Sequence, residues 1–104
     1  MRITTDFIRS ETGNQNYEIS LHADNERLND ELTVSQMESV LKNGEIIEHY
    51  ESDTRGESCL VYGRTDNGTD VHIVCGRNRQ GHLFIINVYI PGMPKWLNPR
   101  IRNR

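Results

Sequence analysis

The chain has 104 residues, which is enough for one domain with a single two-layer core and too few for a second core. Its formal net charge of -3 does not favour a nucleic-acid binder, but the charge is unevenly distributed, because the half that ends at Ser58 is acidic and the half that follows is basic. No apolar run is long enough to span a bilayer and the N-terminus lacks a signal-peptide core, so we expect a cytoplasmic protein without a membrane segment.

The N-terminal third contains the helical segments. We interpret residues 1–16 as a semi-ordered arm and residues 17–104 as a single domain with a basic tail. Alternation predicts a short strand over Tyr17 to Leu21, and a short helix is predicted over Asp24 to Leu32. The segment Thr33 to Asn43 is the best helix candidate, because it has a capping box at its start, an apolar stripe and a glycine stop.

The centre of the chain predicts four strands connected by turns. The candidate strands are Glu45 to Glu51, Ser58 to Thr65, Asp70 to Gly76 and Leu83 to Ile90. Because all three connections are short enough for hairpins, we expect a four-stranded antiparallel meander with two short helices packed on one face, plus the short N-terminal strand. The order of elements indicates an α+β fold.

The Asn67-Gly68 pair predicts a two-residue turn, which places Gly63 opposite His72 and Tyr62 opposite Ile73. In this register the helix-covered face carries Leu60, Tyr62, Val71, Ile73 and Cys75, and the last strand presents Leu83, Ile85, Asn87 and Tyr89 on one face. Asn87 and Tyr89 are expected to join His72 on the open face. Cys59 and Cys75 would point to opposite faces and remain reduced thiols. The pattern of Glu45 to Glu51 does not decide whether Glu48 and Tyr50 or His49 face the helices.

Several of these segments form a familiar pattern. The residues are His22-Ala23, Glu26-Arg27, the helix from Thr33, Gly44 to Tyr50, Leu60 to Gly63, the His72 strand and Val88-Tyr89. Together they resemble a bacterial family catalogued as a domain of unknown function, which is grouped with the RelE-like and MqsR-like toxins. The resemblance covers Tyr17 to Arg100. It implies a RelE-like α+β fold in which the open face of the sheet carries the functional site. It also implies an RNA-cleaving toxin that is neutralised by a protein antitoxin.

Metal-independent cleavage of RNA needs a base, an acid and a group that stabilises the charged phosphate. The expected catalytic residues are His72, Glu48, Tyr89, Arg27 and His22. The expected substrate-binding residues are Tyr50, Asn87, Arg100 and Arg102, the last two in a tail that also contains Arg104. Trp96 is expected to hold this tail against the body. The histidines and cysteines lack the paired spacing of a metal site, so we expect neither a metal nor a cofactor.

The same residues also have structural interpretations. His72 could be a satisfied strand histidine, and Glu48 and Arg27 could form a structural ion pair. His22 could bind a backbone group near the start of its helix, and the tail arginines could simply be solvated. The alternative function is therefore a protein-binding module without enzymatic activity on the same fold, which the net negative charge favours.

Overall fold

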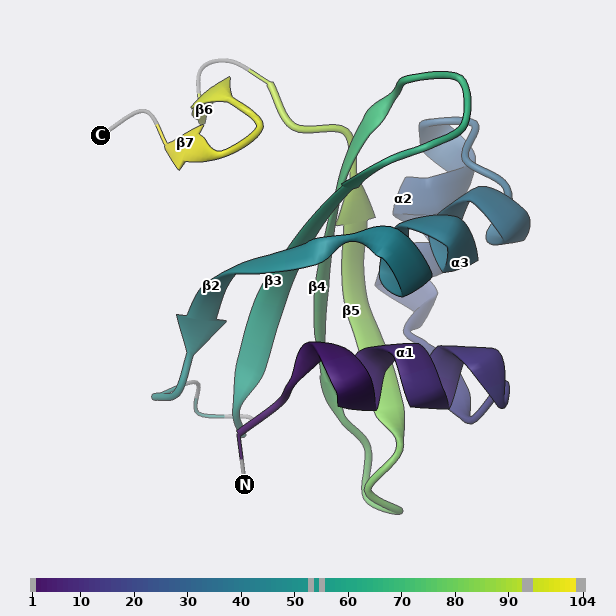
Figure 1. Ribbon diagram of the computed structural model, residues 1–104, viewed down its shortest axis with the longest axis vertical. Helices are drawn as coiled ribbons and strands as arrows, with labels where there is room; N and C mark the ends of the chain where they lie inside the picture. The colour runs from purple at the N-terminus through teal and green to yellow at the C-terminus, as the bar shows by residue number, and fades with distance from the viewer. Residues whose placement is uncertain (1, 53, 55, 93–94, 103–104) are drawn as a thin grey trace.

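The structure is a computed structural model that describes residues 2–52, 54, 56–92 and 95–102. Within these residues it contains three helices, a five-stranded mixed sheet and a two-stranded hairpin (Figure 1), which confirms the α+β class. The helices are α1 (Thr5–Gly13), α2 (Leu21–Asn29) and α3 (Val34–Asn43). The strands are β1 (Tyr17–Ile19), β2 (Glu45–Tyr50), β3 (Ser58–Arg64), β4 (Asp70–Arg77), β5 (Leu83–Tyr89), β6 (Trp96–Asn98) and β7 (Ile101–Arg102).

The helix α3 follows the sequence expectation closely. Thr33 caps it through the backbone N–H of Gln36, and the Gln36 side chain accepts from the Thr33 N–H in return. Helix α2 begins earlier than expected, at Leu21, because the Ser20 hydroxyl accepts from the Ala23 N–H and caps the chain there.

Helix α1 lies in the segment that we interpreted as a semi-ordered arm. The Thr4 hydroxyl accepts from the Phe7 N–H and caps its first turn. Ile8 and Thr12, four residues apart, are both buried, and the Thr12 hydroxyl donates to the Ile8 carbonyl at 2.7 Å. The helix therefore contributes to the core through a stripe too short for the sequence pattern to reveal.

The expected four-stranded antiparallel meander is wrong as a description of the sheet. Strands β2 to β5 do pair antiparallel in chain order, but β1 adds to the outer side of β5 in parallel, giving the order β1-β5-β4-β3-β2. The connection from β1 to β5 runs through α2, α3 and three strands, so no short turn in the sequence could predict the pairing.

The register between β3 and β4 also differs from the expectation by one residue. Tyr62 lies opposite His72, and Gly63 lies opposite Val71. The cause is the turn: Thr65 and Thr69 close a three-residue loop in which Gly68 has a φ of 82°, instead of a two-residue loop at Asn67-Gly68. A shift of one residue moves every side chain of β3 to the other face. Cys59 and Cys75 are consequently neighbours on one face, with their sulfur atoms 3.7 Å apart.

A second irregularity changes the faces of β5. Val74 lies opposite Asn87 and Cys75 opposite Ile85, so Ile86 is an extra residue in β5. Leu83 and Ile85 are buried before this bulge and Val88 is buried after it. Asn87 and Tyr89 therefore share the open face with His72, as expected, whereas their expected alignment with Leu83 and Ile85 is wrong.

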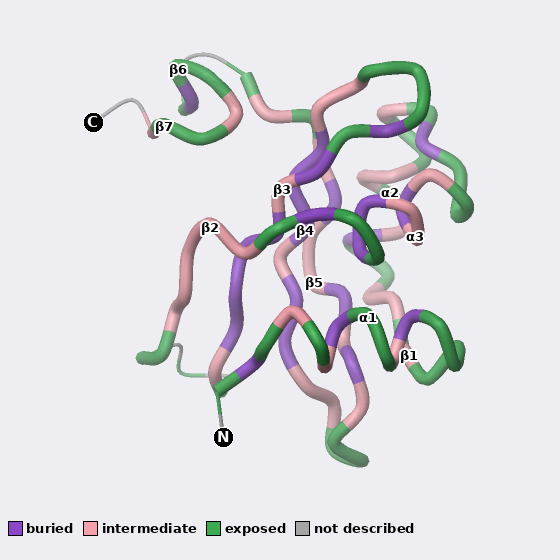
Figure 2. The backbone as a smooth tube through the Cα atoms, in the orientation of Figure 1, coloured by how far each residue is buried: buried purple, intermediate pink, exposed green. Residues whose placement is uncertain are grey.

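The core lies between the helices and one face of the sheet (Figures 1 and 2). Its members include Ile8, Met37, Val40, Leu41, Cys59, Val61, Val71, Ile73, Cys75, Ile85 and Val88. Gly63 permits a close approach of α3, because a Cβ atom at this position would lie 3.0 Å from Cγ1 of Val40. The C-terminal hairpin, which we define as residues 95–102, contains β6 and β7. It packs on the opposite face of the sheet.

Candidate functional site on the open face

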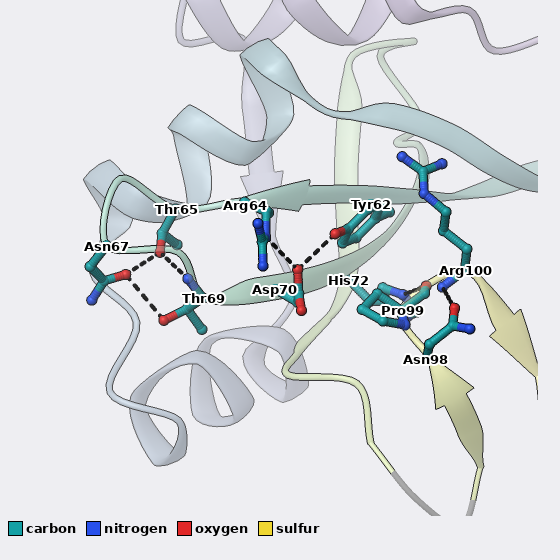
Figure 3. A network of polar contacts seen from close by, with 10 residues as sticks. All are labelled: Tyr62, Arg64, Thr65, Asn67, Thr69, Asp70, His72, Asn98, Pro99 and Arg100. Atoms are coloured by element: carbon teal, nitrogen blue, oxygen red, sulfur yellow. Dashed lines mark hydrogen bonds and ion pairs between the residues drawn. The ribbon is translucent and has the colours of Figure 1, made fainter.

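His72 is held at the centre of the open face and is completely buried. Its Nε2 lies 2.6 Å from the carbonyl oxygen of Pro99, and its Nδ1 lies 3.2 Å from the hydroxyl of Tyr89. A carbonyl oxygen can only accept, so Nε2 carries the proton and Nδ1 accepts from the Tyr89 hydroxyl. Figure 3 shows the imidazole against Pro99 of the C-terminal hairpin.

Trp96 covers the histidine from the hairpin side, which confirms that it fastens the tail to the body. The two rings meet edge to face with centroids 4.4 Å apart, and Trp96 is 1% exposed. The buried indole Nε1–H of Trp96 makes no well-formed hydrogen bond with the described residues, although its proximity lowers the pKa of Tyr89. Burial is the larger influence on Tyr89 and raises its pKa above the usual value.

Burial also determines the charge of His72. Loss of hydration lowers the pKa of His72 below 6.5, while the Pro99 carbonyl and the charge of Glu48 oppose this shift. The imidazole is therefore neutral at pH 7 and is available to accept a proton at Nδ1.

Glu48 is on the open face, because a bulge after Ile46 in β2 places it opposite Leu60. Arg102 of the hairpin binds both of its carboxylate oxygens, with Nε to Oε2 at 3.1 Å and Nη2 to Oε1 at 2.9 Å. The Tyr50 hydroxyl donates to Glu48 and accepts from Arg102 at 3.1 Å. Burial, followed by the hydrogen bond to Glu48, raises the pKa of Tyr50 to about 12. Tyr50 is thus a neutral donor in this cluster.

These groups border a hollow that we call the tyrosine pocket. It has a volume of about 290 Å³ and is lined by Glu26, Tyr50, Val74, Asn87, Tyr89, Lys95 and Arg102. The residues come from α2, β2, β4, β5 and the C-terminal hairpin. Aromatic hydroxyls, two cations and a carboxylate therefore converge at one place from distant parts of the sequence.

The structure brings most of the expected site residues together. Tyr50, Asn87, Tyr89 and Arg102 line the pocket, while Glu48 binds Tyr50 and Arg102, and His72 binds Tyr89. Arg100 lies outside the pocket, with its guanidinium 4.9 Å from the centre of the Tyr62 ring. Arg104 is outside the described residues.

Two expected catalytic residues lie elsewhere. Arg27 donates to Asp24 at 2.7 Å and to the Leu32 carbonyl at 2.8 Å, so it closes the connection between α2 and α3. The suggested ion pair between Glu48 and Arg27 is therefore wrong, because each residue has a different partner. His22 is exposed at the start of α2 and reaches the pocket only indirectly, through Glu26 at 3.4 Å.

Sequence reasoning missed Glu26 and Lys95. Glu26 accepts from the Asn87 side chain at 3.2 Å and from the Val88 N–H at 3.0 Å. Strand β1 pairs only with residues 83–85 of β5, so Glu26 binds an edge N–H group of β5 that β1 does not reach. Its spacing of four residues from His22 was the available signal for a shared helix face. Lys95 could have been found as the neighbour of Trp96, the residue that anchors the hairpin.

In the described part of the chain, no three or more His, Cys, Asp or Glu side chains form a group able to hold a metal ion. Nor is any described helix long and apolar enough to cross a membrane.

The model of a family described as Domain of unknown function (DUF4258) matches residues 19–90, which include α2, α3 and strands β2 to β5. No curated protein and no solved structure matches the chain.

Proposed function

The chain belongs to the DUF4258 family of unknown function, and from this premise we propose that it is a metal-independent endoribonuclease that cleaves single-stranded RNA at the tyrosine pocket. The observation that carries the proposal is the contact of Tyr89 with a buried, neutral His72 at one wall of a pocket that also presents Arg102 and Lys95. Such a set supplies a proton relay and two cations for a phosphate.

The proposed reaction begins with the 2′-hydroxyl of the substrate. Since His72 is buried, it reaches the substrate only through Tyr89. The Tyr89 hydroxyl passes its proton to Nδ1 of His72 and takes the proton of the 2′-hydroxyl, whose oxygen then attacks the adjacent phosphorus. The Pro99 carbonyl accepts from Nε2 throughout and stabilises the imidazolium that forms.

The second half of the reaction reverses the relay. The bond from phosphorus to the 5′-oxygen breaks, and that oxygen receives a proton from Tyr89, which regains one from His72. The products are a 2′,3′-cyclic phosphate and a free 5′-hydroxyl. Arg102 and Lys95 stabilise the charged phosphate during both steps, and Glu48 and Tyr50 hold the Arg102 guanidinium in place.

Membership of a toxin group similar to the RelE-like and MqsR-like proteins, with a protein antitoxin as partner, is part of this proposal. A feature that supports a protein partner is the exposure of Leu21 and Leu28, which are 79% and 57% exposed. They are seven residues apart and hence share one face of α2. The same feature favours the second candidate function, a protein-binding module without enzymatic activity.

The test is incubation of the purified protein with end-labelled RNA in the presence of EDTA. The proposal predicts fragments that end in 2′,3′-cyclic phosphate, and RNA binding that weakens steeply with salt. Intact RNA together with no measurable RNA affinity would instead support the binding module. Induced expression of the parent beside His72→Ala, with total RNA examined from each culture, then tests whether cleavage arrests growth.

A further inference from the structure

A second hollow is also bordered by the C-terminal hairpin, through Arg100, and we call it the arginine hollow. Its volume is about 470 Å³, and its lining includes Arg9, Glu45, Tyr62, Arg64 and Arg100. The three arginines come from α1, from β3 and from the C-terminal hairpin. They are therefore brought together by the fold and do not belong to one charged stretch of sequence.

Most of the donors in this hollow have no partner among the described residues. A guanidinium has five N–H donors in a fixed fork. Arg9 gives one to the Gly44 carbonyl at 3.5 Å, Arg64 gives Nε to Asp70 at 3.0 Å, and Arg100 pairs with Glu45 through Nη1. The side chains of Arg64 and Arg100 are 65% and 58% exposed, so their remaining donors are open to a ligand.

The charge balance of the hollow favours an anion. Its lining has three guanidinium groups and one carboxylate, that of Glu45. Asp70, just outside the lining, is occupied by Arg64 and by the Tyr62 hydroxyl at 2.7 Å (Figure 3). Gly44 contributes a carbonyl, but Arg9 already donates to it. Planar guanidinium forks of this kind match the oxygen atoms of a phosphate group.

His72 lies between a tyrosine of the arginine hollow and a tyrosine of the tyrosine pocket. Tyr62 and Tyr89 flank the imidazole, with centroid distances of 6.0 Å and 5.3 Å. Tyr62 belongs to the arginine hollow and Tyr89 to the tyrosine pocket. Arg100 of the hairpin lines the arginine hollow, and Arg102, two residues later, lines the tyrosine pocket.

We infer that the arginine hollow binds a backbone phosphate of the same RNA strand, beside the linkage that is cleaved in the tyrosine pocket. The inference rests on the proposed function and extends it, because it makes the substrate an RNA strand of several nucleotides. The recognised chemistry is a phosphate group. It could also be supplied by a small phosphate, so the test includes both sources.

The experiment measures binding of a fluorescein-labelled uridine decamer at several salt concentrations, from about 50 to about 200 mM. The variant is Arg9→Gln with Arg64→Gln, and the control is Arg79→Gln, an exposed arginine at the turn between β4 and β5. The expected result is weaker binding by the double variant and a slope of log affinity against log salt that is smaller by about 0.7 per lost phosphate contact. The control should keep the parental slope.

A double variant that binds like the parent, or a control that weakens equally, would overturn the inference. Arg9→Lys with Arg64→Lys, which keeps the charge, should recover part of the lost slope. Inorganic pyrophosphate should compete only weakly, and competition as strong as that of the decamer would overturn the assignment to RNA. Cleavage of RNA by the parent is measured separately. If RNA binding depends on the arginines but the parent does not cleave RNA, the proposed function is rejected and the phosphate site is retained. If the parent cleaves RNA but the double variant has the parental salt slope, the phosphate site is rejected and the proposed function is retained.

Discussion

Truncation of Trp96 should release the C-terminal hairpin from the sheet and expose His72. Burial of a tryptophan removes roughly 150–250 Å² from water, which at about 25 cal/mol per Å² stabilises by roughly 4–6 kcal/mol. Within the described part of the chain the buried indole N–H of Trp96 lacks a well-formed hydrogen bond, and such a group costs about 1–3 kcal/mol. The net contribution is then roughly 3 kcal/mol, so Trp96→Ala should raise the fraction of open hairpin about a hundredfold.

The assay is an NMR titration of His72 combined with limited digestion by trypsin, which cuts after Lys95, Arg100 and Arg102. In Trp96→Ala the pKa of His72 should move up towards 6.5, because burial is the main cause of its depression, and the hairpin should be digested faster. Trp96→Phe retains an aromatic ring and removes the buried N–H, so it should keep the hairpin closed. An unchanged His72 pKa and unchanged digestion in Trp96→Ala would refute the view that this residue holds the hairpin.

Two further predictions concern stability. The folded state lowers the pKa of His72, so the unfolded chain binds the extra proton first, and the free energy of unfolding should fall as pH drops below about 6.5. His72→Gln, which keeps a side-chain donor for the Pro99 carbonyl, should flatten this part of the profile. The charged groups that act on His72, which are Glu48, Asp70 and Arg102, are present in both proteins, so an identical slope in chemical denaturation would contradict the assigned shift. Gly63→Ala should destabilise by about 1–3 kcal/mol, because its new Cβ would press on Val40 of α3. In the matched control Gly13→Ala, the new Cβ meets no described atom within 4 Å apart from its chain neighbours and its own helix backbone, so this variant should be neutral or slightly stabilising in thermal melts. Equal effects of the two substitutions would show that α3 moves away from the new Cβ at little cost.

The elements whose signals are local could be predicted from the sequence. The capping box at Thr33 and Gln36 marked α3, and the runs rich in β-branched, aliphatic and aromatic residues marked strands β2 to β5. Turn chemistry located the turn between β3 and β4 at Gly68, but it did not give the number of residues in the loop. A three-residue loop and a two-residue loop use the same Asn-Gly pair, and the choice between them decides the face of every residue in β3.

The site was predictable as a list of residues but not as an arrangement. The open-face position of His72, Asn87 and Tyr89 followed from alternation, although the bulge at Ile86 was invisible because Ile85 and Ile86 are equally apolar. The pairing of Glu48 with Arg102 joins residues 54 positions apart, and the burial of His72 depends on a hairpin that begins more than twenty residues later. Contacts of this range leave no periodic trace in a sequence.

The measurement that tests the central claim most directly is the single-turnover rate of RNA cleavage by the parent, Tyr89→Phe and Tyr17→Phe. Tyr17 is the matched control, because its hydroxyl also binds a side chain, Glu38 at 2.6 Å, but lies outside the tyrosine pocket. If Tyr89 relays protons between the 2′-hydroxyl and His72, its phenylalanine variant should be slower by about 10²–10⁴-fold, with Tyr17→Phe close to the parent. Cleavage by Tyr89→Phe at the parental rate would contradict the relay, and the absence of cleavage by the parent would contradict the function itself.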